Sequence, residues 1–268
     1  RSLALLPLKS LLQVHPVNRQ FHALARSLAS TWSAFVISGF NIERAEASKF
    51  DMLCEYVSPC ANSAVAVGCM CRTDFCNDKF SKLCSMLPAS LHTLNLSRNQ
   101  LDEDGIGSLS TALQRLQALH LLELSHCRLF LKGQRSWHTL VMSFPASIRV
   151  LGLDGNGYSG MVRDLAAGLR RQLHLEKLSL KWWTDFDEEA NGGTGLSPAF
   201  GGREIDLICG ALPVCLQWLN LIGSVEFYYY GYEAAESLAS HLQKFPGLLG
   251  LGLAGRCDFD IPPMTCRR

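Results

Sequence analysis

Residues 91–101 read LHTLNLSRNQL, with leucine at the first, fourth, sixth and eleventh places and asparagine at the ninth. Leucine or isoleucine returns at the first, fourth and sixth places in five further copies, which start at residues 119, 148, 175, 216 and 248. Successive starts are therefore 28, 29, 27, 41 and 32 residues apart. A motif that recurs at such intervals predicts a chain built from stacked repeats.

A helix is expected before each strand. In four copies apolar residues stand 4, 8 and 11 places before the first leucine-like residue, which is the spacing of one helix face. Proline stands between the expected helix and the strand before the copies that start at 91, 148, 216 and 248, at residues 88, 145, 213 and 246, where it stops the helix. The expected helix-face residues are Phe21, Leu24 and Leu28; Phe80, Leu83 and Leu87; Trp137, Leu140 and Phe144; and Ile205, Ile208 and Leu212.

The turn after the strand carries a second signature. Three copies have Asn99, Cys127 and Asn156 at the ninth place, followed two residues later by Leu101, Leu129 and Tyr158. This pattern resembles the leucine-rich repeat, and intervals near 28 residues resemble its ribonuclease-inhibitor-like subclass. The resemblance implies that the ninth side chain hydrogen-bonds the backbone of the turn.

The resemblance also implies the fold, an α/β horseshoe-shaped solenoid with parallel strands on the concave face and helices on the convex face. One strand and one helix cannot bury their apolar faces alone, so neighbouring units must stack. Packed helices need about 8–10 Å while parallel strands lie about 4.8 Å apart, so the stack bends with its strands inside. We expect one domain over residues 1–268, with clear repeats over 81–262.

Residues 1–80 are expected to be degenerate repeats or an N-terminal cap. The template fits loosely in this part of the chain, and each fit depends on only three or four apolar residues. The weak copies are Leu3, Leu6 and Leu8; Trp32, Phe35, Ile37 and Ile42; and Ala64, Val67 and Cys69.

The concave wall can be read from the sequence because side chains alternate along a strand. The residues between the template positions are mostly small, with isolated acids such as Glu123 and Asp154. Ribonuclease inhibitors use a strongly acidic wall, so binding of a ribonuclease is not expected. The outward residues are Thr93, Asn95 and Ser97; Leu121, Glu123 and Ser125; Val150, Gly152 and Asp154; Lys177, Ser179 and Lys181; Trp218, Asn220 and Ile222; and Gly250, Gly252 and Ala254.

The 41-residue interval contains an insertion at about residues 181–202. Insertions in solenoids form loops on one edge, and the next unit is rich in aromatic residues at the corresponding strand exit. Aromatic side chains anchor many protein interfaces, so this edge is a candidate partner site. The alternative is that the aromatic side chains pack the insertion onto the solenoid. The candidate partner-binding residues are Glu123, Lys181, Trp182, Trp183, Phe186, Trp218, Phe227, Tyr228, Tyr229 and Tyr230.

Several enzyme-like patterns have ordinary explanations. Gly155, Gly157 and Gly160 match G-x-G-x-x-G after a predicted strand, but the residues between them occupy repeat positions. Cys69, Cys71, Cys76 and Cys84 lack the paired C-x2-C spacing of structural zinc sites, so reduced thiols are favoured. The acidic run from Asp185 lacks the glycine of a calcium loop. We therefore expect no catalytic residues, no cofactor and no bound metal.

Composition excludes other classes of partner. The formal net charge of +1 provides no long-range field to attract nucleic acid. No apolar stretch reaches the 18 residues or more of a membrane span.

The 11 cysteines are an odd number and cannot all pair within one chain. An intracellular location is expected, with the cytoplasm favoured and an organelle as the alternative, because the chain starts at Arg1 rather than Met.

The function expected from the repeat is non-catalytic. A long curved wall suits a macromolecular partner, so we predict a protein-interaction module: a scaffold or an accessory subunit of a large assembly. The alternative is an enzyme regulator, because the pattern also resembles Ran GTPase-activating proteins. The acidic tail usual in those proteins is absent from residues 264–268.

Overall fold

The computed structural model describes residues 34–38, 64–68, 77–99, 101–129, 133–156, 160–181, 200–223 and 231–253. Strands and helices alternate along this part of the chain. They are β1 (Ala34–Ser38), β2 (Ala64–Gly68), α4 (Asn77–Met86), β3 (Thr93–Asn95), α5 (Glu103–Arg115), β4 (Leu121–Glu123), α6 (Gln134–Met142), β5 (Val150–Gly152), α7 (Val162–Leu169), β6 (Lys177–Ser179), α8 (Gly202–Ala211), β7 (Trp218–Asn220), α9 (Gly231–Leu242) and β8 (Gly250–Gly252).

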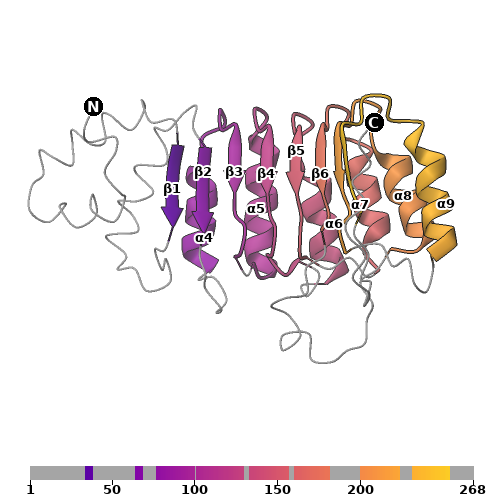
Figure 1. Ribbon diagram of the computed structural model, residues 1–268. Coiled ribbons are helices and arrows are strands. Elements are labelled where there is room, and N and C mark those ends of the chain that lie inside the picture. The colour runs from indigo at the N-terminus through magenta and orange to yellow at the C-terminus, as the bar shows by residue number, and fades with distance from the viewer. Residues whose placement is uncertain are drawn as a thin grey trace, which may run out of the picture.

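The strands form one parallel sheet in the order β1 to β8, which is also their order along the chain. Figure 1 shows the helices α4 to α9 in a row against one face of this sheet. Each strand and the helix beside it therefore contact mainly the next unit, as in a solenoid. Eight strands at about 4.8 Å spacing give a sheet roughly 34 Å wide.

The core lies between the sheet and the helices, where the template leucines were expected. In the five copies that start at residues 91, 119, 148, 175 and 216, every side chain at the first, fourth and sixth places is at most 1% exposed. The predicted helix-face residues of α4, α6 and α8 are at most 3% exposed; Phe21, Leu24 and Leu28 lie outside the described residues. Burial of one leucine side chain stabilises the fold by about 1.5–3 kcal/mol.

The weak copy aligned at Ala64, Val67 and Cys69 is wrong by two residues. Val65 of β2 stands beside Leu94 of β3 and beside Phe35 of β1, so Val65 rather than Val67 occupies the fourth place. A shift of two residues leaves the same side chains on the same face of the strand. The hydrophobic pattern alone could not reveal the error. The copy at Leu3 to Leu8 lies outside the described residues.

The ninth side chains hydrogen-bond the turn backbone, as the resemblance implied. Asn156 Oδ1 accepts a hydrogen bond from the Cys127 backbone N–H at 2.9 Å, and Asn156 Nδ2 donates to the Leu124 carbonyl at 2.8 Å. Cys127 Sγ and Asn99 Nδ2 both donate to the Leu96 carbonyl, at 3.1 and 2.6 Å. These buried contacts tie each turn to its neighbour.

The glycine pattern at residues 155–160 is part of the same turn. Gly155 has φ +64°, and Arg98 and His126 have φ 63° and 58° at the equivalent place of the two preceding copies. The left-handed conformation therefore belongs to the repeat and not to a phosphate-binding loop. Gly157 lies outside the described residues.

The insertion is located between β6 and α8. Lys181 follows β6, and Phe200, just before α8, is 1% exposed and belongs to the core. Residues 182–199 lie outside the described residues. The insertion expected at about residues 181–202 therefore falls almost entirely outside the described residues, and its arrangement stays a prediction.

Candidate protein-binding site on the concave face

The open face of the sheet carries two rows of side chains, from the third and fifth places of each unit. Strands β3 and β4 show the expected alternation, with a buried leucine between two half-buried residues. The third-place row is Thr93, Leu121, Val150, Lys177, Trp218 and Gly250, and the fifth-place row is Asn95, Glu123, Gly152, Ser179, Asn220 and Gly252.

Three side chains of these rows lie over glycines of the next strand. The indole of Trp218 covers Gly250, the carboxylate of Glu123 covers Gly152, and the amide of Asn220 covers Gly252. A Cβ atom at any of these glycines would come closer than 3.0 Å to the covering side chain. Because these glycines have no side chain, the side chains of Trp218, Glu123 and Asn220 can lie flat along the sheet.

Trp218 is the most prominent of the three. It is 48% exposed even though the six-membered ring of its indole lies against β8. In the same row, Leu121 and Val150 are half-buried, and Lys177 stands beside Trp218 in the strand register. A large aromatic side chain with a defined place on an open surface is the usual form of an interface anchor.

A chain of hydrogen bonds runs along the strand exits from β4 to β7. Ser125 Oγ donates to Glu123 Oε1 and accepts from the Asp154 backbone N–H at 3.0 Å. Asp154 Oδ1 accepts from Ser179 Oγ at 2.5 Å, and Asn220 Nδ2 donates to the same Ser179 Oγ at 3.1 Å. We call these residues, Glu123, Ser125, Asp154, Ser179 and Asn220, the polar chain. It fixes the polar side chains next to the third-place row.

Comparison with known proteins agrees with this geometry. The chain matches no protein-family model and none of the curated proteins. Among solved structures, it is similar to the leucine-rich repeat-containing protein LegL7 from Legionella pneumophila, with a TM-score of 0.50 and 16% identity; the match covers 95% of this chain and 81% of that one. The chain has the leucine-rich-repeat fold. The tropomodulin C-terminal domain of Caenorhabditis elegans also matches, with a TM-score of 0.42 and 12% identity over 63% of this chain and 95% of that one.

The leucine-rich-repeat sheet brings three of the ten predicted partner-binding residues onto one wall. Glu123 lies on β4 and Trp218 on β7, and Lys181 follows β6, where its backbone N–H donates to Asp154 Oδ1 at 2.7 Å. The other seven lie outside the described residues: Trp182, Trp183, Phe186, Phe227, Tyr228, Tyr229 and Tyr230.

The sequence analysis missed three exposed apolar side chains at the opposite, strand-entry edge. Leu173, Val214 and Leu249 are 68%, 62% and 82% exposed. They precede β6, β7 and β8, in the helix-to-strand turns where polar residues are usual. The sequence could have indicated these exposed side chains, because an apolar residue in a helix-to-strand turn is unusual.

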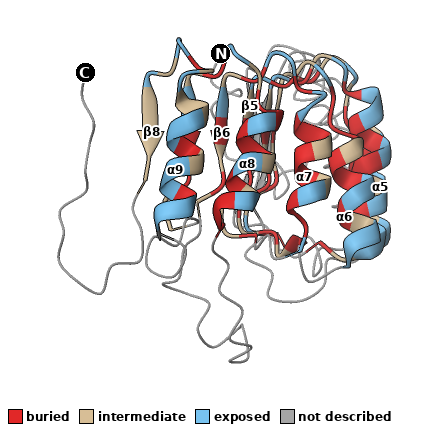
Figure 2. Ribbon diagram, turned by 90° about the vertical axis from the view of Figure 1, so that its right-hand side faces the viewer, coloured by how far each residue is buried: buried red, intermediate tan, exposed pale blue. Residues whose placement is uncertain are grey.

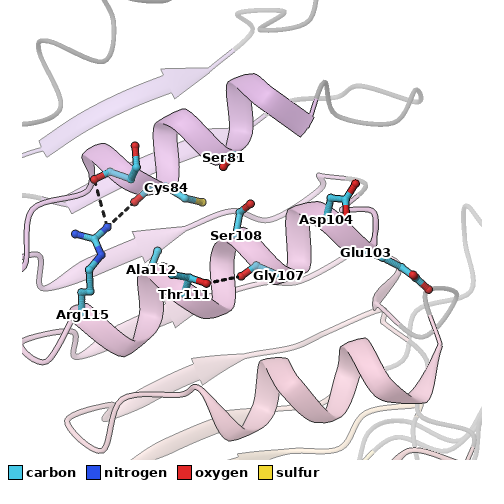
Figure 3. Close-up of a pocket in the computed structure, with 10 residues that line it drawn as sticks. Ser81, Cys84, Glu103, Asp104, Gly107, Ser108, Thr111, Ala112 and Arg115 are labelled. Atoms are coloured by element: carbon cyan, nitrogen blue, oxygen red, sulfur yellow. Dashed lines mark hydrogen bonds between the residues drawn. The ribbon is translucent and has the colours of Figure 1, made fainter.

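A groove on the convex face was also missed. It has a volume of about 620 Å³ and lies between α4 and α5, with small residues such as Ser81, Gly107 and Ala112 along it (Figure 3). Arg115 crosses one end and donates from Nη2 to the carbonyls of Cys84 and Ser85, at 2.9 and 3.3 Å. Arg115 thus caps the end of α4.

The described part of the chain holds no reactive cluster. Burial raises the pKa of the Cys84, Cys127 and Cys209 thiols to about 12, so none is a thiolate at neutral pH. Among the described residues no group of three or more histidine, cysteine or acidic residues could hold a metal ion. His92 and His120 stack on each other with ring centroids 5.2 Å apart. None of the described helices is long and apolar enough to cross a membrane.

Proposed function

We propose that this leucine-rich-repeat chain is a non-catalytic protein-interaction module, a scaffold or accessory subunit, that binds its partner on the concave face. The observation that supports this most directly is Trp218, half exposed and lying over Gly250. A side chain that is already ordered loses little conformational entropy on binding. Aromatic anchors of this kind contribute much of the affinity of protein interfaces.

The surroundings of Trp218 favour a protein partner. Leu121 and Val150 extend the apolar row, and the polar chain beside them provides hydrogen-bonding groups of fixed orientation. The wall carries both acidic residues, Glu123 and Asp154, and basic residues, Lys177 and Lys181, so no single sign of charge dominates. This mixture of apolar, polar and charged groups is typical of protein–protein interfaces.

We further propose that the site continues onto the strand-exit edge, through the predicted residues Trp182, Trp183, Phe186 and 227–230. The insertion that carries the first three follows Lys181, just past the end of β6, and β6 is the strand adjacent to β7, which carries Trp218. The intervals near 28 residues and the full α-helices on the convex face support the ribonuclease-inhibitor-like subclass. The free buried thiols support an intracellular location.

Affinity purification with the full chain, from the source in which it occurs, tests the proposal when the recovered protein is identified by mass spectrometry and its affinity is then measured. The variant Trp218→Ala is expected to bind that protein about 30-fold more weakly or worse, since it removes an anchor worth about 2 kcal/mol or more. The matched control is Leu173→Ala, which truncates an apolar residue on the other edge that is even more exposed than Trp218. Equal loss in both variants, or in neither, would contradict the concave-face site.

Two further measurements separate the alternatives. Deletion of residues 183–199, which keeps the buried Phe200 and the start of α8, is expected to weaken the binding of the same partner if the aromatic edge contributes, and to leave affinity unchanged if the insertion only packs on the solenoid. Small GTPases incubated with the chain are expected to hydrolyse GTP at their intrinsic rates. Stimulation of hydrolysis would instead support the regulator that resembles Ran GTPase-activating proteins.

A further inference from the structure

The last unit of the described solenoid has an uncovered end. Leu248, Leu251 and Leu253 occupy the template positions of this unit and are only half-buried, whereas the equivalent leucines of the preceding unit are 0% exposed. Strand β8 is the last strand of the described sheet, and α9 is its last helix. Figure 2 shows β8 in the colour of intermediate burial at this end.

Helix α9 has an apolar side that faces away from the other described units of the solenoid. Ala234 and Leu238 point into the core, and Ser237 and His241 contact α8, where they hydrogen-bond Asp206. At 100° per residue, the side opposite α8 carries four residues at spacings of 3, 4 and 3. They are Tyr232, Ala235 and Ala239, all exposed, and Leu242, half-buried.

No charged residue belongs to this stripe, although α9 contains Glu233, Glu236 and His241 on its other sides. We call Tyr232, Ala235, Ala239 and Leu242, together with Leu248, Leu251 and Leu253, the end face. Spacings of 3 and 4 residues with apolar side chains are typical of helices that pack against another helix.

The same side of the preceding helix is covered. On α8, Cys209 is 0% exposed, and Gly202 lies so close to the backbone of Glu233 that a Cβ atom there would be 3.0 Å from its carbonyl oxygen. The end face is therefore on the side of α9 that corresponds to the side of α8 on which α9 packs, although α8 has the charged Asp206 where α9 has Ala239.

We propose that the end face binds the end face of a second copy of this chain, about a two-fold axis that runs from the sheet to the helices. This interface is distinct from the concave face and does not depend on the function proposed for it. Both layers continue across the junction: α9 packs against α9 of the second copy, and β8 pairs with β8 of the second copy.

The helix stripe is complementary to itself when two copies run antiparallel. Tyr232 then faces Leu242 of the second copy, and Ala235 faces Ala239 of the second copy. The stripe is symmetric about residue 237, so all four pairs form at once. Large residues lie at the ends and alanines at the centre, which lets the two helices approach closely.

Strand β8 has no protection against pairing with another strand. Residues 247–253 contain no charge and no proline, the two features by which edge strands usually prevent such pairing. Gly250 N–H donates to the Gln217 carbonyl and the Gly252 carbonyl accepts from Leu221 N–H, so these residues bond to β7. Alternate residues of a parallel strand bond to the same neighbour, which leaves the N–H and C=O of Leu251 directed outward.

A single two-fold axis is compatible with both the strand contact and the helix contact. Antiparallel pairing centred on Leu251 makes two hydrogen bonds between Leu251 and Leu251 of the second copy. Leu251 is the midpoint of β8, and residue 237 is close to the midpoint of α9. The two-fold axis that relates the strands therefore also relates the helices.

Sedimentation velocity of the full chain between roughly 1 and 100 µM tests the proposal. The expected species has twice the chain mass of 29.6 kDa. Ala239→Arg, which places two arginines at the centre of the helix contact, is expected to weaken association at least ~100-fold, because an unpaired charge is buried. The control Ser240→Arg adds the same charge at the next residue, which is exposed and lies outside the stripe, and is expected to remain a dimer.

At a concentration low enough for the parent chain to be monomeric, both variants should melt at the same temperature as the parent, which excludes misfolding as the cause of dissociation. Hydrogen exchange of the Leu251 amide is expected to slow as concentration rises in the parent and in Ser240→Arg, but not in Ala239→Arg. A parent chain that stays monomeric at 100 µM, or an Ala239→Arg variant that still dimerises, overturns the proposal. Trp218→Ala should remain a dimer, so failure of the concave-face site would be recognised separately.

Discussion

The indole of Trp218 lies over Gly250, its neighbour in register on the next strand. Neither residue alone explains the exposed aromatic surface, since any side chain larger than hydrogen at residue 250 would lift the indole from the sheet. The same relationship holds between Glu123 and Gly152 and between Asn220 and Gly252. The shape of the concave wall therefore depends on pairs of residues on adjacent strands, in which a large side chain on one strand lies over a glycine on the next.

Gly250→Ala is expected to displace the indole of Trp218 and to weaken partner binding together with a loss of stability of about 1 kcal/mol. Thermal unfolding and the affinity of the identified partner measure the two effects. Gly247→Ala is the control, because no atom lies within 4 Å of a Cβ built there. If both variants behave alike, the packing of Trp218 on Gly250 has no functional consequence.

Asn156→Ala is expected to lower the free energy of unfolding by about 2–4 kcal/mol. The change leaves the buried N–H of Cys127 and the carbonyl of Leu124 without their partner, and buried unpaired groups are costly. Asn95→Ala provides the comparison, since Asn95 is half-buried on the concave wall and water can replace its bonds to Ser97. Denaturant titration should show a loss of about 1 kcal/mol or less for Asn95→Ala; equal losses would refute the structural role of Asn156.

Two helix glycines are expected to respond to alanine in opposite directions. At Gly168 of α7 a Cβ atom would lie 2.8 Å from the backbone oxygen of Val141, so Gly168→Ala should destabilise by about 1–3 kcal/mol. At Gly107 of α5 nothing lies within 4 Å, so Gly107→Ala should stabilise by about 0.5–1 kcal/mol through helix propensity. Melting midpoints that move in the same direction would contradict the packing of α7 on α6.

Stability is expected to fall as pH rises from 9.0 toward about 12. Burial raises the pKa of the Cys84, Cys127 and Cys209 thiols from 9.0 to about 12. The unfolded chain loses these protons first, so the contribution is complete below pH 9 and is lost above it, at about 1.4 kcal/mol per pH unit for each thiol. Denaturant titrations at several pH values should give a shallower decline for Cys209→Ala. An unchanged slope would mean that Cys209 is not shielded from water in the folded state.

Much of the fold was predictable because it depends on local spacing. The leucines at the first, fourth and sixth places and the helix faces of α4, α6 and α8 are buried as predicted, and Asn156 and Cys127 hydrogen-bond the turns. The error at β2 has a clear reason: a shift of two residues preserves the inward pattern, so only the pairing of Val65 with Leu94 reveals the register.

The sites were less predictable, because they depend on neighbours that are about 30 residues apart. The sequence identified Trp218, Glu123 and Lys181 as outward-facing but not the glycines beneath two of them. It also contains the stripe from Tyr232 to Leu242 without showing that α8 covers the other side of α9. Exposure of Leu173 and Val214 likewise became visible only in the folded chain.

The sequence by itself determined that this chain is a repeat of strands and helices and which residues form its core. These properties follow from the alternation of apolar residues along single segments. Tertiary structure decided which exposed side chains have a fixed place and which apolar surface is left without cover by the other described residues. Both depend on the close contact of adjacent units, as when Gly250 accommodates Trp218 and when α9 has α8 on only one side.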